Sequence, residues 1–347
     1  MTLTIGRRGL IGGTAGALTA ATLPYDLALA QPAAPSTTLR VGMTASAVPL
    51  SNGVPDQGGE GHRFMGITLY DQLVMWDLSK SDAPATLRPG LATAWRNDPT
   101  DRRRWIMTLR EGVKFHDGKV MDSADVVFSY DRAFKADAPH YDPRANAFAR
   151  IRMPTIAAWR AEGPNTFILE TTRPDSFVPY GLTWVGITHQ GAWEAAGRSW
   201  DTYLGRAVGT GPWRMESFSI RERCVMTRFA DYWDAGRIPR TGRLVLLPLP
   251  EANTRVAALR SGQVDFIEAP PPDAIPSLRA AGFQVISNQY PHNWTWHFSM
   301  VEGSPWRDRR IRQAANFAID RKGISEMLGG MGAPGAGLVP PGHPWHG

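Results

Sequence analysis

The stretch that most constrains this chain is Val208-Gly-Thr-Gly-Pro-Trp213. Its two glycines allow backbone angles that a Cβ atom would forbid, and its proline fixes φ where the stretch ends. Such a stretch can turn sharply while main chain or a ligand passes close by. Taken alone, these six residues favour an ordinary tight turn before a strand, so their significance depends on the segments around them.

The length and the charge distribution of the chain bear on the number of lobes and on the kind of partner. A chain of 347 residues is too long for one ordinary core, so we expect at least two lobes. The net charge of +6 is not gathered into a tail, and the basic clusters at 102–104 and 307–312 fit a solvated turn and a solvated helix start. Because no basic face accompanies a recognised binding module, we expect no nucleic-acid partner.

The cysteine content excludes two kinds of site. Cys224 is the single cysteine of the sequence, so neither an intramolecular disulfide nor a thiolate metal cluster can form. It lies in an alternating run, which predicts a buried and inert thiol on a strand rather than a nucleophile.

Residues 1–30 have the composition of a secretory signal. Arg7-Arg8 precedes an apolar run from Leu10 to Leu23, and Ala28-Leu29-Ala30 fits a cleavage site after Ala30. The paired arginines favour the twin-arginine export route, with the general export route as the alternative. No cysteine lies near the cleavage site, so we expect a periplasmic protein without a lipid anchor there.

Apolar periodicity predicts an alternation of strands and helices, which indicates α/β architecture. Strands are predicted at 39–43, 167–170, 243–247, 264–267 and, with aromatic residues, 294–298. Helices are predicted at 64–76 and 254–261, after the N-cap signal Asp122–Asp125, and after Asp308. Residues 105–110 and 113–115 are expected to form a β-hairpin, and His116 is expected in a polar turn.

Several motifs in order resemble one protein family. They are Leu87-Arg-Pro-Gly-Leu-Ala-Thr-Ala-Trp95, Leu109-Arg-Glu-Gly-Val-Lys-Phe-His-Asp-Gly118, Ser123-Ala-Asp-Val-Val-Phe-Ser-Tyr130, Val208–Trp213, Tyr232-Trp233, Asn253-Thr-Arg-Val-Ala-Ala-Leu-Arg-Ser-Gly-Gln-Val-Asp265 and Ile311-Arg-Gln-Ala-Ala-Asn-Phe-Ala-Ile-Asp320. Together they resemble the extracellular solute-binding proteins of ABC importers, in the peptide/nickel class that includes dipeptide and oligopeptide binders. The similarity covers most of the chain after residue 38.

The resemblance implies a periplasmic binding protein-like (type II) α/β fold with two lobes and an inserted α+β subdomain. The first lobe would comprise residues 31–76 and 186–290, the inserted subdomain residues 77–185, and an incomplete second lobe residues 291–347. Such a receptor closes around a solute in the cleft between its lobes. It is expected to be a monomer that delivers a peptide, a metal chelate or a similar small solute to an ABC permease in the inner membrane.

The chain departs from the family pattern in two places. Val48-Pro-Leu-Ser-Asn52 stands where the family often has Leu-Asp-Pro, so the start of the binding loop is atypical. The sequence also stops soon after the first helix of the second lobe, so we expect a C-terminally truncated member. In the peptide binders, the acidic residue that pairs with the ligand amine lies in the part that is missing here.

Candidate ligand contacts come from a glycine-rich loop and from aromatic side chains. Glycines expose main-chain hydrogen-bonding groups, a carboxylate or amide in the loop could meet an amide or ammonium group, and rigid aromatics can sandwich a ligand. A plain surface loop and ordinary core packing are the structural alternatives. The candidate ligand contacts are Gln57, Gly58, Gly59, Glu60, Trp213, Trp294 and Trp296, and the candidate hinge is Gly209, Thr210, Gly211 and Pro212.

The sequence provides little support for an enzyme. His292 with His297 and His343 with His346 have no carboxylate or cysteine that completes a metal set, so no metal, cofactor or catalytic residue is expected. No hydrolase, phosphate-loop or dinucleotide motif appears with the right flanks. An exported cofactor-dependent enzyme and a non-functional fragment of a binding protein remain the alternatives.

Overall fold

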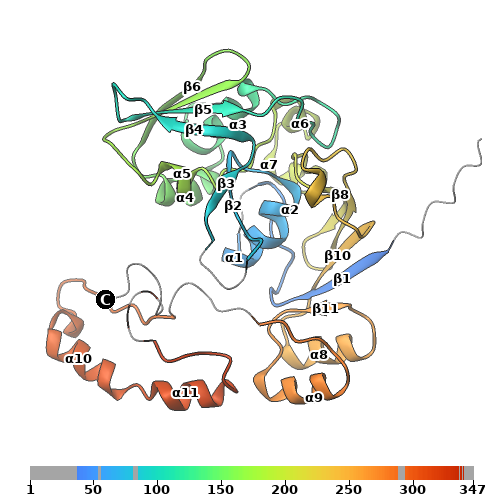
Figure 1. The fold of residues 1–347 in the computed structure, drawn as a ribbon, viewed down its shortest axis with the longest axis vertical. Coiled ribbons are helices and arrows are strands. Elements are labelled where there is room, and N and C mark those ends of the chain that lie inside the picture. Colours follow the sequence, from blue (N-terminus) through green and yellow to red (C-terminus); the bar gives the residue numbers. More distant parts are fainter. Residues whose placement is uncertain are drawn as a thin grey trace, which may run out of the picture. The chain divides into compact units, whose positions relative to one another are not determined.

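The computed structural model describes residues 37–53, 56–80, 85–287, 294–335, 337 and 339 of the chain (Figure 1). The predicted export signal at 1–30, and with it Arg7, Arg8 and the cleavage site after Ala30, lies outside these residues. Outside them too lie His292, His343 and His346. In the described part of the chain, no helix is long and apolar enough to cross a membrane.

A five-stranded sheet with the order β11-β1-β10-β9-β8 forms one half of the fold. Its strands are β1 (Thr38–Met43), β8 (Trp213–Ser219), β9 (Arg223–Arg228), β10 (Arg243–Pro248) and β11 (Phe266–Ile267). Strand β1 runs parallel to both β10 and β11, whereas β9 is antiparallel to β10 and β8 is antiparallel to β9. The helix α8 (Ala252–Arg260) connects the parallel strands β10 and β11, as expected of α/β architecture.

A four-stranded antiparallel sheet with the order β4-β5-β7-β6 forms the second half. Its strands are β4 (Ala92–Asn97), β5 (Arg104–Leu109), β6 (Ile156–Ala161) and β7 (Thr166–Thr171), and β2 (Val74–Trp76) pairs separately with β3 (Leu87–Pro89). The helix α3 (Ser123–Phe134) packs on this sheet, with the Tyr130 ring 4.8 Å from that of Phe167. Asp122 caps α3, as the sequence predicts, and Asp125 completes a capping box with it.

Short helices make up most of the remaining regular structure. The helical run from residue 58 to 69 consists of α1 (Gly58–Gly61), the π-helix η1 (His62–Gly66) and α2 (Ile67–Leu69). The others are α4 (Pro143–Arg152), α5 (Val178–Gly181), α6 (Gln190–Ala195), α7 (Trp200–Tyr203), α9 (Ile275–Ala280), α10 (Arg309–Ala318) and α11 (Arg321–Met327), with the 3-10 turns η2 (Leu204–Arg206), η3 (Ala235–Arg237), η4 (Pro272–Ala274) and η5 (Pro305–Arg307).

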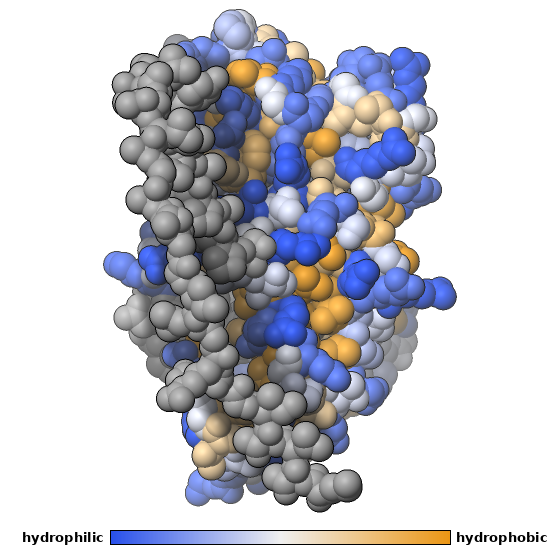
Figure 2. Space-filling model, turned by 90° about the vertical axis from the view of Figure 1, so that its right-hand side faces the viewer, coloured by the Kyte–Doolittle hydropathy of each residue, from blue (hydrophilic) through white to orange (hydrophobic). Residues whose placement is uncertain are grey.

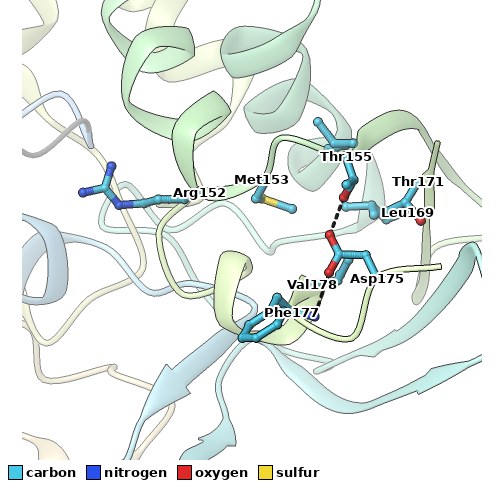
Figure 3. A pocket seen from close by; sticks show the side chains of 9 residues that line it. Arg152, Met153, Thr155, Leu169, Thr171, Asp175, Phe177 and Val178 are labelled. Atoms are coloured by element: carbon cyan, nitrogen blue, oxygen red, sulfur yellow. Dashed lines mark hydrogen bonds between the residues drawn. The ribbon is translucent and has the colours of Figure 1, made fainter. Parts of the chain in front are cut away.

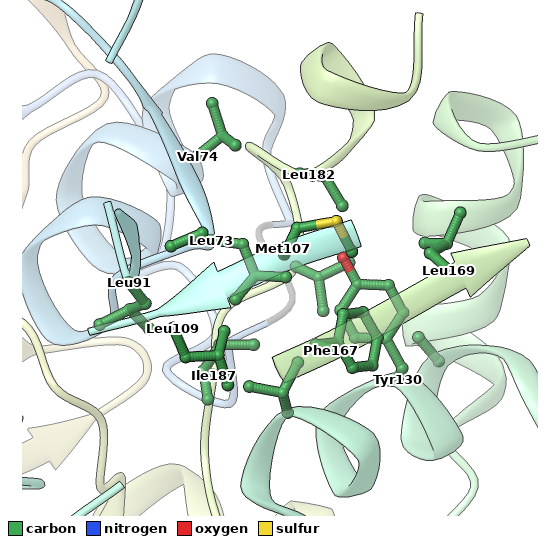
Figure 4. Close-up of a cluster of buried hydrophobic side chains, with 14 of the residues drawn as sticks. Leu73, Val74, Leu91, Met107, Leu109, Tyr130, Phe167, Leu169, Leu182 and Ile187 are labelled. Carbon is green, nitrogen blue, oxygen red and sulfur yellow. The ribbon is translucent and has the colours of Figure 1, made fainter. Parts of the chain in front are cut away.

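The two sheets have separate hydrophobic cores. Met107, Leu109 and Phe167 of the four-stranded sheet lie in one hydrophobic cluster with Tyr130 of α3 and the buried Leu73 (Figure 4). Met43, Leu246 and the inert Cys224 lie in the core of the five-stranded sheet, and burial raises the pKa of the Cys224 thiol to about 12. On the face drawn in Figure 2, hydrophilic side chains are interspersed with apolar ones.

Several sequence predictions of strands and helices are confirmed. The structure has strands β1, β7, β10 and β11 in the predicted regions, although β11 comprises only two residues. Helix α8 is followed by Gly262 at φ +73°, and Asp308 caps α10 by accepting a hydrogen bond from the Arg310 N–H. Each of these signals is local, because a cap or an alternating run is complete within a few residues.

The predicted hairpin of 105–110 with 113–115 is wrong. Strand β5 pairs instead with β4 and β7, and the following segment folds back on itself through the bonds from Phe115 N–H to Lys119 O and from Met121 N–H to Val113 O. The competing partner β7 begins more than 50 residues after β5 ends, so nothing near β5 in the sequence indicates it.

Two further predictions require correction. The helix predicted over 64–76 ends at Leu69, and the extended strand β2 follows because its partner β3 offers hydrogen bonds. The aromatic strand predicted at 294–298 is absent: these residues have no regular secondary structure and pair with no strand in the described part of the chain. Alternating aromatic residues favour a strand only where a neighbouring strand supplies the ladder.

Candidate functional site

The parallel strands of the five-stranded sheet end at one common edge. Met43 of β1 lies beside Pro248 of β10, and Gly42 lies beside Ile267 of β11. The segments that follow these strands therefore leave the sheet together. In open α/β sheets, ligands bind in the crevice outside the carboxyl ends of the parallel strands.

The Gln57–Gly61 segment is held against this edge by side-chain hydrogen bonds. The two carboxylate oxygens of Glu60 accept hydrogen bonds from Thr44 Oγ1 at 2.8 Å and from the Ala45 N–H at 2.9 Å. The Gln57 side chain donates to the Ala47 carbonyl at 3.1 Å. The predicted ligand-binding loop therefore lies beside the residues that follow β1.

A second carboxylate, Glu268, follows β11 at the same edge. It pairs with the guanidinium of Arg63 from η1, and its side chain is only 13% exposed. Burial raises the pKa of Glu268, and the neighbouring carboxyl of Glu60 raises it further against the opposing charge of Arg63. The edge therefore carries a pair of carboxylates, with the guanidinium of Arg63 beside Glu268.

Arg255 of α8 holds the backbone of this edge in place through hydrogen bonds. Its guanidinium is buried and donates to four carbonyl oxygens, those of Leu249 and Pro250 after β10 and those of Glu268 and Ala269 after β11. One cation thereby ties together the chain segments that leave two strands of the sheet. The arrangement orients the backbone from which the Glu268 carboxylate projects.

The backbone on both sides of the carboxylate pair is in an unfavourable conformation. Gln57 has φ +56° and Ala269 has φ +42°, a region that costs non-glycine residues free energy. Gly61 has no room for a side chain, because a Cβ would lie 1.7 Å from the Asp56 carbonyl oxygen. Such conformations persist where the surroundings hold them, and they concentrate at binding sites.

The other predicted site residues lie elsewhere. Trp213 begins β8 and is buried in the core of the five-stranded sheet, as the structural alternative had it. Trp294 and Trp296 are 91% and 71% exposed and belong to no strand. Gly209, Thr210, Gly211 and Pro212, predicted as a hinge, are fully buried. The structure thus brings Gln57, Gly58, Gly59 and Glu60 together with Glu268 and Arg63, and buries Trp213 apart from them.

The pockets within the fold are small. One lies beside Thr155 and Asp175, and Figure 3 shows the Asp175 carboxylate already bonded to the Thr155 hydroxyl and the Phe177 N–H. Among the residues described, no group of three or more His, Cys, Asp or Glu could hold a metal ion.

Comparison with known proteins gives the family. Residues 86–347 match the model of the bacterial extracellular solute-binding proteins, family 5 (middle region). The chain belongs to this family. Its name describes solute binding and no reaction, in agreement with the prediction that the chain is not an enzyme.

Individual relatives are more distant. The heme-binding protein A of Haemophilus influenzae is 26% identical over 79% of this chain and 51% of its own length, and the dipeptide-binding protein of Escherichia coli K12 is 25% identical over 79% and 53%. The crystal structure of a Pseudoalteromonas dipeptide-binding protein in complex with Met-Leu superposes with a TM-score of 0.68 at 22% identity, over 83% of this chain and 58% of that one. The chain spans about half the length of the curated relatives it matches.

This likeness of structure shows a mixed α/β fold of the periplasmic binding protein kind over part of its length. Within this solute-binding protein, sequence reasoning missed Arg63, Arg255 and Glu268. A usable signal was present for the last of these, since Glu268 directly follows a predicted strand whose carboxyl end belongs to the same edge as that of β1. Arg63 and Arg255 gave no comparable signal, because each acquires its role through contacts distant in sequence.

Proposed function

We propose that this chain is the periplasmic substrate-binding component of an ABC importer, which binds a small solute and passes it unchanged to a permease in the inner membrane. The observation that carries the proposal is the position of the Gln57–Gly61 loop and Glu268 at the carboxyl edge of the parallel strands. In the residues that the structure describes there, the edge presents main-chain groups, carboxylates and the guanidinium of Arg63, with no nucleophile paired with a base.

The proposed fold has two lobes of the type II kind, with the solute in the cleft between them. Residues 31–76 and 186–290 form the first lobe, which is consistent with the five-stranded sheet being built from these ranges alone. Residues 77–185 form the inserted subdomain around the four-stranded sheet, and residues 291–347 begin the second lobe. The exported protein is proposed to act as a monomer without a cofactor.

The chemistry of the edge favours a solute with a cationic or hydrogen-bond-donating group. A solute ammonium could pair with the Glu60 and Glu268 carboxylates. Main-chain groups of Gly58 and Gly59 could meet an amide, since no atom lies within 4 Å of where their Cβ would stand. A peptide fits both requirements, and a metal chelate that carries amines also fits them.

Titration calorimetry tests this proposal with the dipeptide Met-Leu, heme and a nickel–histidine chelate as probes. We expect saturable heat with at least one probe and its recovery unchanged by mass spectrometry. The variant Glu268→Gln is expected to weaken binding about tenfold, because a charge-assisted bond is lost. Glu222→Gln, which removes an equal charge from an exposed position, should bind as the wild type does. Absence of saturable binding by all three probes, or equal affinity of Glu268→Gln, would contradict the proposal.

One observation favours the alternative of a fragment without binding activity. Helices α10 and α11 bury none of their residues, and Phe317 and Met327 are 88% and 71% exposed. Apolar side chains that are exposed in this way promote association. A soluble, cooperatively unfolding monomer at micromolar concentration would exclude this alternative, whereas aggregation in sizing chromatography would support it.

A further inference from the structure

Asp71, between α2 and β2, is a buried carboxylate that accepts hydrogen bonds from two other segments of the chain, at Thr210 and at Tyr232-Trp233. It is fully buried, and it accepts hydrogen bonds from Trp233 Nε1 at 2.8 Å, Tyr232 Oη at 2.9 Å and Thr210 Oγ1 at 3.1 Å. Burial raises the pKa of Asp71, against the lowering effect of these donors and of Arg237, whose guanidinium lies 3.8 Å away. Three segments that are far apart in the sequence thus meet on one side chain.

The Val208–Pro212 segment is bound on both of its sides. On one side the Gly211 N–H donates to the Leu69 carbonyl at 3.0 Å, and a Cβ on Gly211 would lie 2.5 Å from the Thr68 carbonyl oxygen. On the other side the Gly209 N–H donates to His116 Nδ1 at 3.2 Å, and His116 Nε2 lies 3.0 Å from the Gly211 carbonyl oxygen. The ring therefore carries its proton on Nε2 and donates it to that carbonyl.

The Val208–Pro212 segment contacts the end of the helical run that carries the candidate site. Leu69 is the last residue of α2, and α1, η1 and α2 are continuous from Gly58. Glu60 and Arg63 lie near the start of this run. The Gln72 side chain also donates to the Gly66 carbonyl at 3.0 Å, which fixes the run from the side next to Asp71.

We propose that Asp71 is a positioning residue, which holds Thr210 and thereby clamps the Val208–Pro212 segment against Leu69, so that Glu60 stays seated on Thr44 and Ala45. This inference rests on the proposed function for its consequence, because Glu60 belongs to the proposed binding edge. In this arrangement the segment is a fixed joint, and not the hinge that its two glycines indicate. Movement that accompanies solute binding is then located outside Val208–Pro212.

A matched pair of substitutions at Thr210 separates the effect of losing the hydroxyl donor from the effect of changing the side-chain volume. Thr210→Val keeps the shape and removes the donor to Asp71, whereas Thr210→Ser keeps the donor and removes a methyl group. The readout is amide hydrogen exchange at Ala45, whose N–H donates to Glu60. Met107→Ala in the core of the four-stranded sheet serves as the control for general loss of stability.

We expect Thr210→Val to accelerate exchange at Ala45 about tenfold or more, because a donor to a buried carboxylate is lost. Thr210→Ser should restore the wild-type rate, and Met107→Ala should leave Ala45 no faster than the rest of the five-stranded sheet. The proposal is overturned if Thr210→Val accelerates only amides near Thr210, or if Thr210→Ser accelerates Ala45 as much as Thr210→Val does.

A second variant covers the case in which Thr210→Val fails to fold. Trp233→Phe removes one indole donor to Asp71 and keeps an aromatic ring beneath Arg110, which lies 4.2 Å from the Trp233 ring. It is expected to accelerate exchange at Ala45 several-fold, and an unchanged rate would overturn the proposal. No solute is added in either experiment, so a failure of the clamp is distinguished from a failure of the proposed binding function.

Discussion

Arg255 illustrates how a single residue can shape a site without facing the ligand. It places a buried charge against four carbonyl oxygens and has no carboxylate partner in the hydrogen bonds described for it. Backbone carbonyls compensate the cost of burying the cation because they converge on a planar group with several donors. The positive φ of Ala269 is held by the same contact.

Arg255→Lys should destabilise the protein by about 2–3 kcal/mol, because an ammonium cannot reach all four carbonyls from one position. Chemical denaturation at pH 7 measures the effect. Arg260→Lys on the same helix is the control, since this exposed side chain donates only to Ser277, and it should change stability by less than about 0.5 kcal/mol. Equal effects of the two variants would contradict the role given to Arg255.

The burial of His116 predicts how the stability of the protein depends on pH. Burial lowers its pKa from 6.5 to about 4, so the folded protein keeps the ring neutral while the unfolded chain takes up a proton below pH 6.5. The contribution of His116 to stability is therefore complete above pH 6.5 and is lost as the pH falls towards 4, at up to about 1.4 kcal/mol per pH unit. In His116→Asn the loss of stability between pH 6.5 and 4.5 should be shallower than in the wild type, whereas identical pH profiles would refute this origin.

At the scale of elements, the segment before β8 contains two glycines that lie against neighbouring backbone. Two glycines in six residues indicate freedom, yet both are required by close packing against the Thr68–Tyr70 backbone. Their missing side chains allow close approach, a use of glycine that differs from rotation about a positive φ. Neither Gly209 nor Gly211 is among the described glycines with positive φ.

Gly211→Ala should consequently destabilise the protein by about 3 kcal/mol, because the added Cβ meets backbone atoms that cannot rotate away. Thermal unfolding followed by circular dichroism provides the measurement. Gly236→Ala serves as the matched control, since its nearest atom would lie 3.5 Å away, in ordinary contact. A Gly211→Ala protein with an unchanged melting temperature would show that the segment yields, as a hinge would.

Signals within a few residues predict where helices begin, whereas contacts between segments that are distant in the sequence cannot be predicted from such local patterns. The N-caps of α3 and α10 are complete within four residues, and the sequence predicts both. The pairing of β5 with β7 and the burial of Asp71 depend on residues far along the chain. For the same reason Glu60 was found through its glycine-rich loop, while its partner Glu268, 208 residues later, was not.

At the scale of the whole molecule, the two sheets of the described structure contribute in different ways to the proposed site. The five-stranded sheet presents the carboxylate edge, and the four-stranded sheet contributes His116 through the segment after β5. The residues from 294 onward add helices without buried side chains. The proposed site therefore depends on contacts made within residues 37–287.

The most direct test of solute binding at the carboxylate edge is amide hydrogen exchange of the full chain, with and without a saturating probe that gives heat in calorimetry. We predict that the probe slows exchange at Ala45, at residues 57–61 and at Ala269, while the amides of the four-stranded sheet keep their rates. Slowed exchange confined to the four-stranded sheet, or chemical conversion of the probe, would contradict the account.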